Sequence, residues 1–192
     1  MPLFPRPLIM GKRGLVASGH YLATEAGMRI LRQGGNAVDA AAATGFCLSL
    51  LEPQDNSPGG EVPTLVYMAK QKKVFAISGV GWAPKAFTIE WCRQNKIALI
   101  PGDGYLPACV PAITGTWAAA LQRFGTMSLA QVLQPAIELA ENGFPMYEAL
   151  RRRIAENQTK FREIYPSSAE VYLPKGRVPE IGELYNTAAV VR

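Results

Sequence analysis

The chain has 192 residues, of which 48% are hydrophobic and 18% charged, and this much apolar material excludes a disordered or fibrous protein. We therefore expect one globular segment over residues 1–192. The formal net charge of +5 would suit an anionic partner, but the basic residues are scattered and are densest only at Arg151, Arg152 and Arg153. Without a basic face that carries aromatic residues, or a docking motif, we expect no nucleic-acid partner.

The three cysteines, Cys47, Cys92 and Cys109, are odd in number and lack CxxC spacing, so we expect neither a disulfide framework nor a zinc site. Each thiol is interpreted as a small buried hydrophobe. The longest apolar run, Ala40 to Leu51, is shorter than the roughly 18 residues that a membrane helix needs. Residues 1–19 carry their basic residues after the apolar stretch, which is the wrong order for a secretory signal. We expect a cytoplasmic protein without a membrane partner.

The first predicted elements are a short strand over residues 14–18 and a helix over residues 21–33, in which apolar side chains recur at helical spacing. Ser18 or His20 stands where this helix begins. The pair Gly34-Gly35 ends it, because glycine takes the left-handed conformation at a helix C-terminus without steric cost.

A second helix follows directly. Asn36 can cap its free amides, and Asp39 lies near the positive end of the helix dipole. Residues 40–51 are apolar almost all round, which predicts a helix that is buried on most faces. The small residues of Ala40–Ala43 and Gly45 allow a neighbouring layer to approach closely, as in a layered α/β architecture.

The remaining elements are a loop, a hairpin, a turn, four helices and an irregular tail. The loop spans residues 52–61, and the two hairpin strands span residues 62–68 and 73–78. A turn is predicted at residues 102–104 and an extended apolar stretch at residues 105–111. The four helices are predicted over residues 88–95, 113–124, 128–142 and 147–165. From Pro166 onward, prolines at 166, 174 and 179 indicate an irregular connection.

Residues with obvious chemistry are few. His20 is the one histidine, so a Ser-His-Asp or Cys-His arrangement would have to include it, although its place before a helix favours a surface or capping role. The chain has no GxSxG elbow, P-loop, HExxH or dinucleotide fingerprint. The turn Gly102-Asp103-Gly104 lacks the third glycine that such loops need. We therefore expect no cofactor and no metal.

Several segments, taken in order, carry a specific pattern. Residues 14–43 read GLVASGHYLATEAGMRILRQGGNAVDAAAA, and further blocks are EP at 52–53, AP at 83–84, VPAITG at 110–115 followed by Trp117, FG at 124–125, LQPAI at 133–137 and LAENGFP at 139–145. This series resembles the γ-glutamyltransferase (γ-glutamyltranspeptidase) family, whose start is written roughly as VASxHPLAxxAGxxILxxGGNAVDAAVA. The resemblance runs from about residue 11 to at least residue 150.

The resemblance implies an N-terminal-nucleophile hydrolase with a four-layer αββα sandwich, an α/β (α+β) fold of which this chain is a part. Such a precursor cuts itself before a threonine, whose hydroxyl then attacks an amide carbonyl while its own amino group acts as base. This chain would be the front part of the large subunit. Its Asn186-Thr187 pair does not match the processing motif, so the catalytic nucleophile is expected on a C-terminal small subunit from the same precursor.

The resemblance also places substrate-binding residues at Gly79, Val80, Gly81 and Trp82. In γ-glutamyl enzymes a DxRExAP pattern follows the hairpin, and its arginine pairs with the substrate α-carboxylate; here Val80 stands in that position. The loop over residues 56–63, NSPGGEVP, likewise replaces the usual SGxGGGGF. We therefore expect a small non-γ-glutamyl amide, such as oxamate, as substrate. Trp82 either fills pocket volume or packs in the core.

Other readings remain open. The enzyme could be a γ-glutamyl hydrolase or transferase, or a cephalosporin-type acylase. A catalytically inactive binding relative would keep the helices and lack the processing threonine. A stand-alone α/β domain would fold without further polypeptide, whereas we expect the alanine-rich helix and the hairpin to leave apolar surface that another part of the protein covers.

Overall fold

The protein is described by a computed structural model over residues 8–186. Predictions about residues 1–7, and about Thr187, lie outside the described residues. The helices are α1 (Tyr21–Arg32), α2 (Ala37–Leu51), α3 (Ile89–Gln94), α4 (Ile113–Phe124), α5 (Leu129–Asn142), α6 (Glu148–Glu163) and α7 (Pro166–Tyr172), and the short 3-10 turns are η1 (Ala69–Gln71) and η2 (Pro174–Gly176). The strands are β1 (Thr64–Met68), β2 (Lys73–Ile77), β3 (Phe144–Pro145) and β4 (Leu184–Tyr185).

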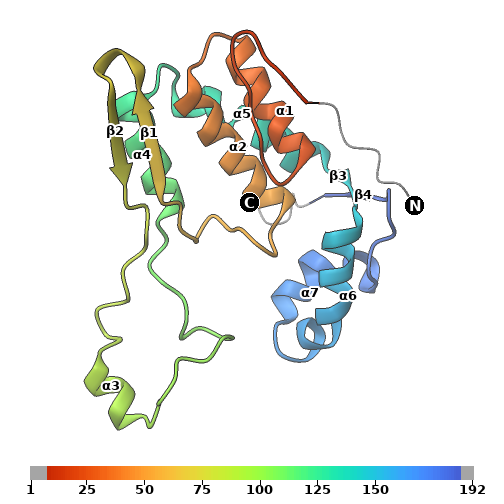
Figure 1. The fold of residues 1–192 in the computed structure, drawn as a ribbon. Helices are drawn as coiled ribbons and strands as arrows, with labels where there is room; N and C mark the ends of the chain where they lie inside the picture. The colour runs from red at the N-terminus through yellow and green to blue at the C-terminus, as the bar shows by residue number, and fades with distance from the viewer. Residues whose placement is uncertain (1–7, 187–192) are drawn as a thin grey trace.

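Helix α2 lies at the centre of a helical layer, where it packs against α1, α4 and α5 (Figure 1). Its small, apolar residues permit this on several sides, and Ala42, Ala43 and Cys47 are completely buried. The predicted helix boundaries agree with the structure to within a few residues for α1 to α6. The prediction that the second helix is buried on most faces is confirmed.

The Asp39 carboxylate, which is completely buried, joins two distant parts of the chain. It accepts hydrogen bonds from the backbone N–H of Asn36 (2.8 Å), from the backbone N–H (2.9 Å) and hydroxyl (2.6 Å) of Thr126, and from the backbone N–H of Met127 (3.2 Å). Burial alone would raise the pKa of Asp39, but these hydrogen bonds hold it below the usual value. The carboxylate therefore fastens the start of α2 to the turn between α4 and α5.

The predicted hairpin is confirmed, with β1 and β2 antiparallel and Val66 opposite Phe75. Val66 is buried against the helices, and the Phe75 ring lies 5.1 Å from the Phe124 ring of α4. On the other face, the side chains of Leu65 and Tyr67 are 76% and 63% exposed. The expected apolar surface is thus present on the hairpin.

Two local predictions were wrong. Residues 14–18 do not form a strand, because no other strand of the described chain lies beside them to complete a hydrogen-bonded ladder. The three cysteines are not all buried: Cys47 is, but Cys92 is half-buried and Cys109 is exposed. Cys109 lies in a segment without a core, so its apolar character gains it no burial.

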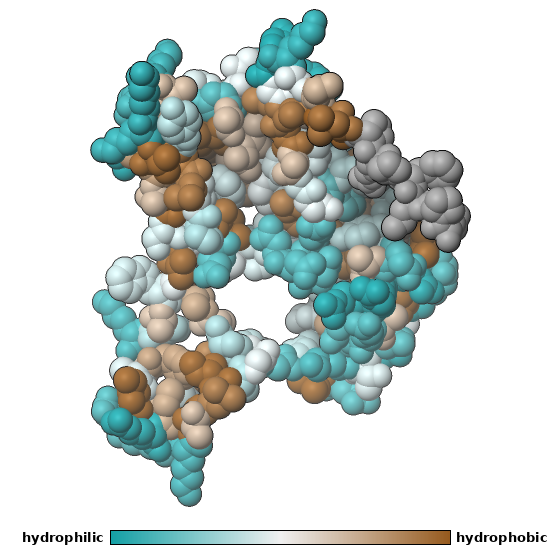
Figure 2. Space-filling model, viewed as in Figure 1, coloured by the Kyte–Doolittle hydropathy of each residue, from teal (hydrophilic) through white to brown (hydrophobic). Residues whose placement is uncertain are grey.

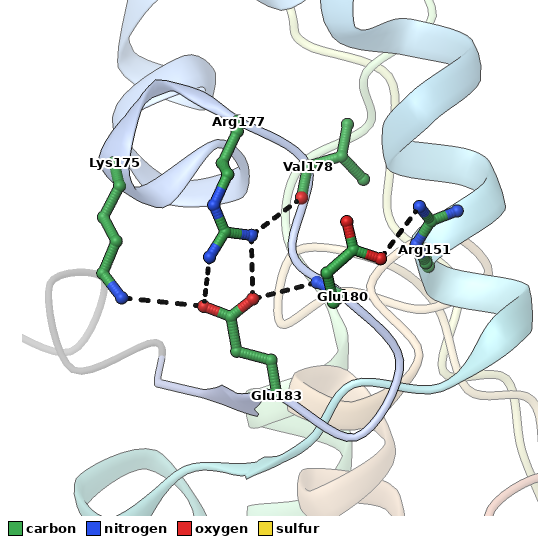
Figure 3. A network of polar contacts seen from close by, with 6 residues as sticks. All are labelled: Arg151, Lys175, Arg177, Val178, Glu180 and Glu183. Carbon is green, nitrogen blue, oxygen red and sulfur yellow. Dashed lines mark hydrogen bonds and ion pairs between the residues drawn. The ribbon is translucent and has the colours of Figure 1, made fainter.

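The tail is also more regular than predicted. Pro166 occupies the first turn of α7, where its missing N–H costs nothing, and β4 pairs with β3. Figure 3 shows the contacts that hold the turn between η2 and β4. The Glu183 carboxylate accepts hydrogen bonds from both terminal nitrogens of Arg177 and from the backbone N–H of Glu180. These contacts lower the pKa of Glu183 to about 2. The expectation of an irregular tail overlooked this tertiary support.

Residues 79–112 form a long excursion between β2 and α4, here called the strap. It contains α3 and projects away from the helical layer (Figure 1). On the other side of the molecule, α6, α7 and the β3–β4 pair form a small lobe around buried Phe144, Leu150 and Tyr185.

Candidate functional site

The predicted substrate-binding segment, Gly79 to Trp82, follows β2 directly and forms the start of the strap. Its backbone is held on both sides: the N–H of Val62 donates to the Gly79 carbonyl (2.8 Å), and the N–H of Val110 donates to the Trp82 carbonyl (2.9 Å). Gly79 has a φ of +58°, and a Cβ there would overlap the Val62 carbonyl. A Cβ on Gly81 would overlap the Val110 carbonyl. Both positions therefore require glycine.

The two side chains of this segment point away from the core. Val80 is 47% exposed and Trp82 is 83% exposed. Within residues 8–186, Trp82 therefore does not pack in a core. Both side chains are available to contact a ligand or another part of the protein, and their role in substrate binding stays a prediction.

An open groove with a volume of about 850 Å³ lies over α2, bounded by residues 13–18, one face of that helix and the 52–62 loop. Its floor is made of small residues such as Ala37, Ala41 and Gly45. Val62 lines the groove and bonds to Gly79, so the predicted segment borders it, although Val80 and Trp82 do not line it. The small-residue face of α2 thus leaves open space above it, and the close approach of a neighbouring layer stays a prediction.

One end of the groove is acidic. Glu52, Asp55 and Glu61 line it together with Asn56. Burial raises the pKa of Glu52, and the negative charge of Asp55 raises it further. The unusual 56–63 loop therefore supplies part of the wall, and sequence reasoning marked this loop as a departure without predicting the acidic cluster.

His20 caps α1 and is buried. Its Nδ1 accepts the backbone N–H of Leu22 (3.2 Å), and its ring lies 4.6 Å from the Tyr21 ring and 4.9 Å from the Tyr147 ring. The Tyr147 hydroxyl donates to the Leu51 carbonyl (2.7 Å), which joins this junction to the end of α2. Of the two roles weighed for His20, the capping role is confirmed and the surface position is wrong.

Protonation of His20 is expected to weaken the fold. Burial lowers its pKa below 6.5, and the Nδ1 lone pair that caps α1 is lost on protonation. The stabilisation is fully present above pH 6.5 and is lost as the pH falls through the lowered pKa. In the full-length protein, the loss of unfolding free energy between pH 7 and pH 5 should be smaller in His20→Asn, because asparagine caps without titrating. Equal losses in the wild type and the variant would contradict this.

Within residues 8–186, no three His, Cys, Asp or Glu side chains lie together so as to hold a metal ion. Among the same residues, none of the helices has both the length and the apolar composition to cross a bilayer.

Comparison with known proteins gives a consistent result. The sequence family described as Gamma-glutamyltranspeptidase matches residues 23–191. The chain is 36% identical over 178 residues to the Glutathione hydrolase-like YwrD proenzyme of Bacillus subtilis (strain 168), covering 92% of this chain and 33% of that protein. The chain spans about a third of the length of the curated relatives it matches.

Two solved structures are similar over nearly the whole chain. The γ-glutamyltranspeptidase of Helicobacter pylori has a TM-score of 0.86 at 30% identity, with 96% of this chain and 53% of that chain covered. The cephalosporin acylase of Bacillus halodurans has a TM-score of 0.81 at 31% identity, with 97% of this chain and 37% of that chain covered. The predicted resemblance and fold class are confirmed, with this chain contributing a helical layer and a hairpin to the larger fold.

Proposed function

Because this chain belongs to the gamma-glutamyltranspeptidase family, we propose that it is the front part of the large subunit of a self-processing amidohydrolase. The nucleophile is an N-terminal threonine on a small subunit that is cut from the same precursor. That threonine attacks the amide carbonyl while its amino group takes the hydroxyl proton. The C–N bond then breaks, the leaving amine takes that proton, and an acyl-enzyme remains. Water or an amine accepts the acyl group and so regenerates the threonine hydroxyl.

The observation that carries this proposal is the family match over residues 23–191, together with a coverage of only about a third of the related proenzymes. The structure supports it in two ways. Among residues 8–186, the His20 ring caps α1 through Nδ1 and forms no hydrogen bond with a Ser, Thr or Cys side chain. The groove over α2 and the exposed face of the hairpin are surfaces that further polypeptide would cover.

The substrate that we propose is a small amide without a γ-glutamyl group, such as oxamate. Valine at position 80 supplies no guanidinium to bind an α-carboxylate, and its side chain is half exposed. A second candidate is a cephalosporin-type acyl amide, which the likeness to the Bacillus halodurans acylase favours. Cytoplasmic location, and the absence of nucleic-acid and membrane partners, stay predictions from the sequence.

The mass of the intact native protein tests the processing step. We expect two chains after maturation, with threonine as the first residue of the second chain, and a single uncut chain when that threonine is replaced by alanine. One unprocessed polypeptide without amide hydrolysis would instead identify a catalytically inactive binding relative. A panel of γ-glutamyl-p-nitroanilide, oxamate and glutaryl-cephalosporin then separates the substrate classes.

A further inference from the structure

The strap buries nothing of its own. Residues 79–112 contain no buried residue, although Leu99 is 86% exposed and Tyr105 is 89% exposed. In Figure 2, apolar side chains gather on this part of the molecule. A segment whose side chains are mostly exposed gains little free energy to offset the entropy of ordering its backbone. Its order must therefore come from contacts at its ends and from whatever covers it.

The strap is attached to the rest of the chain at its base, where its two ends meet the helical layer, and at the turn around Asp103, which is called its tip. At the base, the N–H of Val62 donates to the Gly79 carbonyl (2.8 Å), and the N–H of Ala112 donates to the Gly60 carbonyl (3.2 Å). At the tip, Asp103 accepts hydrogen bonds from the Lys160 ammonium (2.6 Å) and from the Tyr165 hydroxyl (3.2 Å). Between these attachments α3 lies apart from the other helices (Figure 1), and the strap and the lobe enclose an opening above the point where they meet (Figure 2).

The tip contact is a charged pair that can open. The hydrogen bond from Lys160 lowers the pKa of Asp103, and the same bond raises the pKa of Lys160, so both stay charged around neutral pH. The two side chains remain 57% and 40% exposed, and exposed pairs of this kind are weakened by salt. The contact therefore attaches the tip to α6 by a weak interaction that salt can break.

We propose that the strap closes over the polypeptide that follows this chain in the same precursor, and that Asp103, Lys160 and Tyr165 form the latch of the strap. This inference rests on the proposed function, which supplies that polypeptide. The chain spans about a third of its curated relatives, so a large covalently linked partner is at hand at high effective concentration. Because the strap begins at Gly79, closing it also fixes the predicted wall of the substrate site.

The covering partner is identified by photo-crosslinking in the full-length protein with Tyr105→p-benzoylphenylalanine. We expect crosslinks to peptides that lie after residue 192 of the same precursor, at a yield that does not change on dilution. Crosslinks only to residues 1–192 of a second copy, with a yield that falls on dilution, would overturn the proposal. So would the absence of crosslinks. Because chain masses are measured separately, a failure here leaves the two-chain processing result intact.

The latch is tested by the rate at which a thiol reagent modifies Cys109, with buried Cys47 as the internal reference. Asp103→Asn should raise the Cys109 rate at least threefold at low salt and by less in 1 M NaCl. Glu90→Gln is the matched control, because it removes a carboxylate whose partner, Arg93, is on the strap itself. The double variant D103K/K160D should restore the slow rate. A latch role is ruled out if D103N and E90Q behave alike.

Discussion

Replacing Asp39 by alanine in the full-length enzyme is expected to lower the free energy of unfolding by about 3 kcal/mol, or roughly a hundredfold in the folding equilibrium. The substitution leaves the part-buried backbone N–H groups of Asn36, Thr126 and Met127 without their acceptor and empties the completely buried position of the Asp39 side chain. It also disconnects the start of α2 from the α4–α5 turn. Urea unfolding followed by circular dichroism measures the loss.

Two further variants separate the parts of this effect. Thr126→Val keeps the backbone bonds to Asp39 and removes only the hydroxyl donor, so it should cost about 1 kcal/mol. Asp39→Asn keeps an oxygen acceptor and should fall between the two. If Asp39→Ala costs no more than Thr126→Val, the carboxylate does not fasten these elements as described.

Val80→Arg is expected to shift substrate preference toward γ-glutamyl amides by at least tenfold in the ratio of kcat/KM values, measured against oxamate. A guanidinium can bind an α-carboxylate with two parallel hydrogen bonds, and a charge-assisted contact of about 1.5–3 kcal/mol corresponds to roughly 10- to 150-fold. Space for the longer side chain is available, because Val80 is 47% exposed.

Val80→Lys serves as the control, since it adds the charge without the planar fork and should give a smaller shift. The wild-type enzyme should hydrolyse γ-glutamyl-p-nitroanilide poorly. Brisk turnover of that substrate by the wild type would refute the inference from Val80, and an unchanged ratio in Val80→Arg would show that this position does not face the substrate carboxylate.

Local signals predicted the helical layer well. Asn36 with Asp39, and Ser128 with Gln131, satisfy the first amides of α2 and α5 through short-range hydrogen bonds, and Gly143 ends α5 with a positive φ. Such features depend on neighbours in sequence, so they can be predicted from it. The hairpin was predictable for the same reason, because two β-prone runs flank one short polar turn.

Features that depend on distant partners were not predictable. The strand expected at residues 14–18 needs a neighbouring strand that the described chain does not provide. The order of the tail depends on the pairing of β4 with β3, and the role of Asp39 at the α4–α5 turn depends on a partner 87 positions away. For the candidate site, the resemblance proposed Gly79 to Trp82 as substrate-binding residues, which stays a prediction, whereas the acidic end of the groove emerged only from the fold.

The uncovered face of the hairpin has a consequence for biosynthesis. In a precursor of the length of its relatives, about two thirds of the polypeptide leaves the ribosome after this chain. At about 5–20 residues per second, the nascent hairpin is bare for on the order of tens of seconds. During that interval the exposed apolar side chains of Leu65 and Tyr67 can associate with other nascent chains. In the proposed precursor, aggregation during synthesis is therefore governed by how soon the later polypeptide covers this face.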